Sequence, residues 1–319
     1  MGSWRVALEG MVLTYRVLLT GVGGFVGSHL ARQLLAEGHD VTGLISPSTG
    51  RWRIRDIESR LSIVESDLED VAAVEDLIQA TRPEICIHLA WRGWSGRAAA
   101  ETNFTSLSGS LELLRLIQKT SCERFVAAGT CFEYDLEHEQ LAETTPLNPH
   151  DVYGACKKAL FEIAQEFSNL TGLRVLTPRL FYSYGPYEDE RRLVPSTMLR
   201  LLKGETAELT PGLQVRDYLH VEDAASAIWS AATSRIDGAV NIALGEPTTV
   251  AEIAEIIGDL LGRPDLILLG ARDCPENEPM RILADASLLR RKIGWAPKYS
   301  LRDGLAQTLA WWEAWAGHV

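Results

Sequence analysis

Short apolar runs alternate with longer amphipathic stretches through the first half of the chain. Each short run is apolar throughout, which is typical of strands buried on both faces of a parallel sheet. The predicted strands are residues 16–20, 40–45, 61–68, 85–90, 124–130 and 173–181. Helical spacing of apolar residues predicts helices over 25–38, 71–82, 98–119 and 152–172. This order predicts an α/β fold with a doubly wound parallel sheet of the Rossmann type.

The alternation weakens after about residue 182, where Pro and Gly become more frequent. Shorter helices are predicted over 250–262 and 302–315, so a smaller C-terminal α/β substrate lobe is expected there. The predicted division has a loose leader, a dinucleotide-binding Rossmann domain with a returning segment, and a lobe in two pieces. Their bounds are 1–14 for the leader, 15–182 with about 213–244 for the Rossmann domain, and 183–212 with 245–319 for the lobe.

Composition narrows the functional class. Of the 319 residues 46% are hydrophobic, enough for a sizeable core, and the net charge of -12 disfavours binding to nucleic acid or an anionic membrane. No apolar run reaches the roughly 18 residues of a membrane helix, and the N-terminal residues lack the pattern of a secretory signal. The five cysteines are widely spaced, without the pairing typical of zinc ligands, which predicts reduced thiols and no metal site. A cytoplasmic location is expected.

A glycine-rich turn follows the first predicted strand. The segment TGVGGFVG places Gly21, Gly24 and Gly27 directly before the first predicted helix. Such a turn lets the backbone approach a pyrophosphate closely and directs helix N-terminal N–H groups at it. Alone, this spacing also fits an ordinary turn between strand and helix. Its position after a strand and before a helix favours a dinucleotide site.

A tyrosine and a lysine lie four residues apart at the start of a later predicted helix. Tyr153 and Lys157 therefore share one helix face. A phenol with an ordinary pKa of about 10 carries protons poorly at neutral pH, and a nearby ammonium is expected to lower that pKa. Thr130, at the end of the preceding predicted strand, is placed to reach the same substrate oxygen. These three residues are the predicted catalytic group.

The ordered motifs resemble one known family. The glycine turn, YGACK (153–157), PRLFYSYGP (178–186) and RDYLHVEDAA (216–225) are similar to extended short-chain dehydrogenases/reductases of the NAD-dependent epimerase/dehydratase family. The resemblance spans nearly the whole chain. It implies a nicotinamide cofactor, a nucleoside-diphosphate sugar as substrate, a homodimer, and catalysis by the threonine, tyrosine and lysine above.

The resemblance also implies further contacts for the two ligands. The expected cofactor contacts are Gly21, Gly24, Phe25, Val26, Gly27, Ser46, Arg51, Asp67, Leu68, Leu89, Ala90, Tyr153 and Lys157. The expected substrate contacts are Trp91, Thr130, Tyr182, Arg216 and Arg281. The last two are expected to clamp the diphosphate, because guanidinium groups bind phosphate in a bidentate manner. Interdomain salt bridges are the alternative role for both arginines.

Departures from the family pattern bear on the reaction. Family members that prefer NAD end the second strand with an Asp, but Ile45 stands there, followed by Ser46 and Arg51. Hydroxyls and arginine suit the 2′-phosphate of NADPH, which is therefore the expected cofactor; a solvated loop is the alternative. The Asp-Glu pair that family 4,6-dehydratases carry after the threonine is replaced by Cys131 and Phe132. Elimination chemistry is therefore disfavoured.

Aromatic residues at two places in the chain bear on how the substrate would be bound. Tyr182 stands where the family usually has an Asn that meets the sugar nucleotide, which predicts an altered substrate pose. Trp91 and Trp94 follow the fourth predicted strand, where they are expected either to cover a less polar sugar face or to pack between the lobes.

Together these features predict NADPH-dependent reduction of a nucleoside-diphosphate 4-keto-6-deoxysugar at C4. Tyr153 would donate the proton, Lys157 would tune it, and Thr130 would orient the carbonyl. The alternative is a 4-epimerase that retains NAD. A dehydratase and a non-catalytic dinucleotide sensor are the remaining possibilities.

Overall fold

A parallel sheet is the centre of the fold in the computed structural model, which describes residues 13–92 and 100–316. Within these residues eight strands form it, in the order β12-β7-β5-β4-β1-β2-β3, with β6 beside β7. They are β1 (Arg16–Thr20), β2 (Asp40–Ile45), β3 (Ser62–Glu65), β4 (Ile85–His88), β5 (Arg124–Ala127), β6 (Gly129–Thr130), β7 (Arg174–Leu180) and β12 (Gly238–Ile242). The strand order runs outward in both directions from β1 and β4, which confirms the predicted doubly wound Rossmann sheet.

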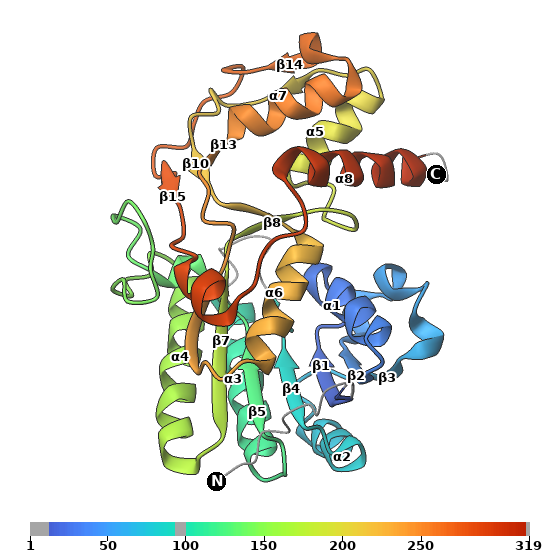
Figure 1. The fold of residues 1–319 in the computed structure, drawn as a ribbon, viewed down its shortest axis with the longest axis vertical. Coiled ribbons are helices and arrows are strands. Elements are labelled where there is room, and N and C mark those ends of the chain that lie inside the picture. Colours follow the sequence, from blue (N-terminus) through green and yellow to red (C-terminus); the bar gives the residue numbers. More distant parts are fainter. Residues whose placement is uncertain (1–12, 93–99, 317–319) are drawn as a thin grey trace.

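Helices cover both faces of this sheet (Figure 1). On one face α1 (Phe25–Ala36) and α6 (Val221–Thr233) pack side by side and share a core with the sheet. The other face is covered by α2 (Val71–Thr81), α3 (Ala100–Gln118) and α4 (Val152–Thr171). The central strands β1, β4, β5 and β7 are covered on both faces, which explains their largely apolar sequences.

The C-terminal part of the chain forms a smaller lobe beyond the carboxyl ends of the strands (Figure 1). Its helices are α5 (Leu193–Leu202), α7 (Val250–Leu261) and α8 (Leu301–Ala316), which share a third core. Its strands are short: β8 (Tyr182–Tyr184) pairs with β11 (Tyr218–His220), β10 (Val215–Arg216) lies between β13 (Thr248–Thr249) and β15 (Arg281–Ile282), and β9 (Ala207–Glu208) pairs with β14 (Ile267–Leu268). The predicted smaller lobe is thus present. The exact domain boundaries stay a prediction.

Residues 1–12 of the predicted leader lie outside the described residues, as does Trp94. In the described part of the chain, no helix is long and apolar enough to span a membrane.

Candidate active site

A cavity of about 450 Å³ lies at the carboxyl edge of the sheet, between the large domain and the lobe. Its walls bring together residues from the glycine turn, the end of β6, the start of α4 and the lobe. A second pocket of about 160 Å³ adjoins it, because Gly21, Gly24, Leu89 and Trp91 line both. The two form one groove over the glycine turn, from the end of β2 to Tyr153.

The glycine turn packs too tightly for any side chain. Gly21 has a φ of +75°, and a Cβ there would lie 2.7 Å from the backbone nitrogen of Ala90. A Cβ on Gly27 would overlap the carbonyl oxygen of Gly21. The turn therefore brings the first turn of α1, with its unsatisfied N–H groups, to the floor of the groove. An elongated groove over such a floor fits a dinucleotide.

Tyr153 is positioned by the first turn of α4. The carboxylate of Asp151 caps this helix by accepting the backbone N–H of Gly154 at 2.7 Å. Gly154 allows the helix to touch the turn after β6, since a Cβ would overlap the carbonyl oxygen of Phe132. This contact places Tyr153 against Thr130, whose hydroxyl hydrogen-bonds to it. Both side chains line the cavity.

Lys157 lies one turn further along α4 and is also buried. Its Nζ donates to the carbonyl oxygen of Ala128 at 2.7 Å and lies 3.9 Å from the ring centroid of Trp91. Burial lowers the pKa of Lys157 to about 7, although the charge of Glu133 raises it. Lys157 therefore stands near the midpoint of its titration at neutral pH.

The expected lowering of the tyrosine pKa is not found. Burial raises the pKa of Tyr153, and the hydrogen bond from Thr130 only partly opposes this rise. Desolvation of a phenolate outweighs the local dipole because the ring lies in a closed part of the cavity. Tyr153 is thus a protonated phenol in this structure.

A buried ion pair holds the end of β6 in place. One carboxylate oxygen of Glu133 accepts the backbone N–H of Thr130 at 2.7 Å, and the other accepts Nε of Arg179 at 2.8 Å. Both charged side chains are almost fully buried. The tight turn over Cys131–Glu133 is fixed by this arrangement, and with it the position of the Thr130 hydroxyl.

Most of the expected cofactor contacts line the groove. The glycine-turn residues and Leu89 line one or both pockets, as do Ser46, Asp67, Leu68 and Ala90. Arg51 lines neither pocket. Its guanidinium is paired with Glu58 at 2.6 Å and Glu65 at 2.8 Å.

The expected substrate contacts divide into two groups. Trp91 and Tyr182 line the cavity, and Trp91 also donates to Asn103 at 2.9 Å. Arg216 and Arg281 line neither pocket. Arg216 is paired with Glu278, and Arg281 donates to the carbonyl oxygen of Glu139 at 2.9 Å. Arg216 thus forms a salt bridge, the alternative role, whereas Arg281 contacts a backbone carbonyl, and the diphosphate contacts of both stay a prediction.

Glu188, Arg192 and Tyr218 are among the cavity residues that the sequence analysis did not assign to the site. Glu188 and Arg192 lie in the loop that follows the GP of the PRLFYSYGP motif and leads into α5. The charged run EDERR in this loop has the composition of a solvated surface. Nothing in the sequence pattern distinguishes the buried carboxylate from its exposed neighbours.

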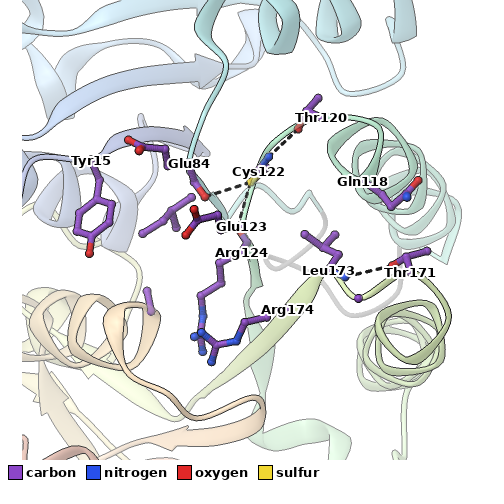
Figure 2. A pocket seen from close by; sticks show the side chains of 13 residues that line it. Tyr15, Glu84, Gln118, Thr120, Cys122, Glu123, Arg124, Thr171, Leu173 and Arg174 are labelled. Carbon is purple, nitrogen blue, oxygen red and sulfur yellow. Dashed lines mark hydrogen bonds between the residues drawn. The ribbon is translucent and has the colours of Figure 1, made fainter. Parts of the chain in front are cut away.

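A third cavity, of about 310 Å³, lies at the opposite edge of the sheet (Figure 2). Arg124 and Arg174, the first residues of β5 and β7, lie next to each other there. Arg124 donates to the carbonyl oxygens of Ser234 and Ile236, and Arg174 pairs with Asp237 at 2.8 Å. These contacts tie the loop before β12 to the sheet. The glycine turn and Tyr153 lie at the other edge, so the chemistry is assigned to the larger cavity.

Comparison with known proteins decides the family. A sequence model of the NAD-dependent epimerase/dehydratase family matches residues 17–243, most of the chain. The chain belongs to this family. It is therefore an enzyme of the nucleotide-sugar epimerase/dehydratase group, as the resemblance of its motifs predicted.

Relatives and solved structures refine the comparison. The chain is 28% identical to a dTDP-glucose 4,6-dehydratase of Xanthomonas campestris pv. campestris, over 92% of both chains. Its fold is similar to that of a UDP-glucose 4-epimerase with UDP-glucose from Thermotoga maritima, with a TM-score of 0.86, 26% identity and coverage of 94% and 99%. It is equally similar to a dTDP-glucose 4,6-dehydratase from Streptomyces venezuelae with NAD bound, with a TM-score of 0.86, 27% identity and coverage of 95% and 98%.

These similarities correct the predicted reaction. The matched proteins are named as dehydratases and epimerases, so the prediction of a ketoreductase for 4-keto-6-deoxysugars is wrong. A nicotinamide dinucleotide cofactor is supported by similar structures that contain NAD, and NADPH in particular is not. Arg51, on which the prediction of NADPH partly rests, is paired with two glutamates in this structure.

Proposed function

We propose that this family member binds NAD and a nucleoside-diphosphate hexose, oxidises the sugar at C4, and regenerates the cofactor within the same turnover. The observation that carries this proposal is the convergence of Thr130, Tyr153 and Lys157 on one cavity beside the glycine turn. The cofactor, when bound, supplies the two-electron acceptor for the oxidation. The remaining work, which is proton transfer and orientation, belongs to the side chains of this chain.

Tyr153 is proposed to exchange the proton of the C4 hydroxyl. Because burial raises its pKa, the phenolate needs stabilisation at the moment of transfer. Thr130 already hydrogen-bonds to the phenol, and the Lys157 ammonium lies one helical turn away. With its pKa near 7, Lys157 is able to take up or release a proton as Tyr153 changes charge.

NAD, rather than NADPH, is the proposed cofactor. Ser46 at the end of β2 donates to Asp67 at 2.6 Å, so a carboxylate lies at this end of the groove. Arg92 is paired there with Asp67 and Glu69, and Arg51 with Glu58 and Glu65, so both arginines near this end of the groove already have carboxylate partners and neither favours a 2′-phosphate. The structures of similar proteins that contain NAD support the same choice.

The turnover is proposed to end in dehydration, because relatives that match over nine-tenths of their length are named dTDP-glucose 4,6-dehydratases. Epimerisation at C4 is the second candidate, and a specific observation favours it. The two residues after Thr130 are Cys131 and Phe132, and the next carboxylate, Glu133, is held in a buried ion pair. The acid and base of an elimination would then have to come from elsewhere in the cavity.

Product analysis separates these reactions. NAD-loaded protein is incubated with dTDP-glucose or UDP-glucose, and the products are examined by mass spectrometry and NMR. Loss of one water supports dehydration, and an unchanged mass with inverted configuration at C4 supports epimerisation. A requirement for stoichiometric NADPH, or no product from any nucleotide hexose, would contradict the proposal.

Replacing Tyr153 by phenylalanine tests the proton carrier. Tyr153→Phe removes only the hydroxyl, so the fold is expected to persist while turnover falls by about 10²–10⁴-fold. Tyr299→Phe is the matched control, because this hydroxyl binds Glu222 at 2.9 Å away from the cavity. It is expected to keep turnover within about twofold. Comparable activity of Tyr153→Phe and wild type would rule out the assigned role.

A further inference from the structure

Glu188 is a buried carboxyl group in the wall of the catalytic cavity that the proposed chemistry leaves unused. Its exposed fraction is 8%, and it lies in the loop between β8 and α5. Among the described residues its Oε2 has no hydrogen-bond partner. A buried polar atom without a partner is costly, so its presence in a ligand cavity points to a group supplied by the ligand.

The surroundings of Glu188 favour its neutral form. Burial raises the pKa of Glu188 to about 8, the nearby Arg192 lowers it, and Asp189 raises it again. Tyr218 on β11 faces the same carboxyl from the lobe, and Arg53 lines the cavity from the large domain. At neutral pH the group therefore carries a proton and has one O–H donor to offer. The terminal torsion of a glutamate is soft, so this O–H is able to turn toward a ligand.

The position of Glu188 favours the sugar nucleotide over the cofactor. The glycine turn and Leu89 form the wall expected to hold the dinucleotide. Glu188 enters from the loop that leads into α5, and its charge interacts with Arg192 and Tyr218, which both lie on the lobe side. Tyr218 in turn packs on Tyr182, with ring centroids 5.6 Å apart, at the expected substrate position.

We propose that Glu188 binds the nucleotide sugar as a neutral acid, donating a hydrogen bond to a hydroxyl or phosphate oxygen, so that affinity for the sugar nucleotide falls at alkaline pH. The idea rests on the proposed function only in requiring a nucleotide sugar as the ligand. Glu188 is a substrate-positioning residue in this account, and it exchanges no proton with the reacting carbon.

The sign of the pH dependence follows from linkage. The complex retains the proton on Glu188, so binding is unaffected well below pH 8. Above pH 8 Glu188 of the free protein loses its proton. Binding of the sugar nucleotide must then take up a proton from solvent, where protons become scarcer as the pH rises. The dissociation constant then rises by about tenfold per pH unit, while ionised Glu188 also repels the diphosphate.

Calorimetric titration of NAD-loaded protein with UDP-glucose and dTDP-glucose, from pH 6 to pH 9, tests the proposal. Wild type is expected to bind both more weakly as the pH passes about 8. Glu188→Gln keeps a donor and cannot ionise, so its affinity should stay near the wild-type value at pH 6 and remain level to pH 9. Glu188→Ala should bind more weakly at every pH, by about five- to tenfold. Glu190→Gln, two residues away and exposed, is the matched control and should behave as wild type.

Each departure from this pattern overturns the proposal. Equal pH dependence in wild type and Glu188→Gln would assign the effect to another group. A pH-dependent affinity for NAD, with level binding of both sugar nucleotides, would place the carboxyl against the cofactor. A wild-type affinity for the sugar nucleotides that does not change from pH 6 to pH 9 overturns the proposal even if a variant fails to fold. All titrations are run in the Tyr153→Phe background, in which wild type means an unchanged Glu188 and turnover is expected to be about 10²–10⁴-fold slower. The measured quantity is affinity and not product, so failure of the proposed reaction stays distinct from failure of this inference.

Discussion

Replacing Glu133 by glutamine tests the buried ion pair that holds Thr130 in the catalytic cavity. The exposed fractions of Glu133 and Arg179 are 0% and 1%, so neither charge is shared with water. Arg179 Nη2 has no hydrogen-bond partner among the described residues, which makes Glu133 the main source of compensation for its charge. Removing one charge of such a pair costs about 3–5 kcal/mol, because the other charge stays buried.

The expected effect of Glu133→Gln is therefore a loss of stability together with a loss of activity. The free energy of unfolding should fall by about 3–5 kcal/mol, and turnover should fall because the backbone N–H of Thr130 loses its charged acceptor. Urea unfolding followed by the fluorescence of the nine tryptophans measures the first, and product formation from a nucleotide hexose measures the second.

Two further proteins complete this experiment. Glu137→Gln removes a charge from an exposed position in the same segment and should leave the free energy of unfolding within about 0.5 kcal/mol. The double variant Glu133→Gln with Arg179→Met removes both charges and should regain part of the lost stability. If Glu133→Gln matched Glu137→Gln in stability and turnover, the ion pair would have neither role.

Two other substitutions test the turn and the domain junction. Gly27→Ala places a Cβ against the carbonyl oxygen of Gly21, so the turn must open, and NAD affinity measured by titration should fall at least about tenfold; unchanged affinity would show that the turn does not form the cofactor floor. Asp217 accepts three backbone N–H groups near the ends of β12 and β15. Asp217→Asn leaves one oxygen for these donors and should lower the free energy of unfolding by about 1–3 kcal/mol in urea, whereas an unchanged midpoint would mean that the donors find other partners.

The sequence predicts the large sheet closely where a strand is a single apolar run. β1 and β2 begin and end at the predicted residues, because polar or glycine-rich turns bound them on both sides. The run 124–130 was predicted as one strand, but it divides into β5 and β6 at Ala128, whose carbonyl oxygen accepts the Lys157 ammonium. This contact comes from a residue 29 positions later, which no local pattern contains.

The sequence gives weaker evidence for the strands of the smaller lobe. Its strands have two or three residues, too few for a period to appear. In β10, Val215 pairs with Arg281 of β15, a partner far away in the chain. Ile282, the other residue of β15, is buried with Tyr134 and Phe181, which are also distant in the chain, so only the three-dimensional fold makes this pairing visible.

The site residues show the same difference between local relations, which the sequence reveals, and relations between distant residues, which it does not. Tyr153 and Lys157 were predictable because their relation is local, four residues on one helix. The ion pairs of Arg51 were not predictable because they involve Glu58 and Glu65, which the turns between β2 and β3 bring to it. Glu188 was missed because the feature that marks it as a candidate is its burial, which the sequence does not show, and not its residue type.

Burial affects the protonation of three cavity residues in the same way. It raises the pKa of Tyr153 and Glu188 and lowers that of Lys157, so each group is moved toward its neutral form. Where Tyr153, Lys157 and Glu188 line the cavity the surroundings are poor in charge and in water, so electrostatic interactions with a bound ligand are correspondingly strong there. The two negative charges of a nucleotide-sugar diphosphate then need cations at the rim, which is where Arg192 stands at the start of α5. A hydrogen bond from a neutral Glu188 would complement that cation without cancelling its charge.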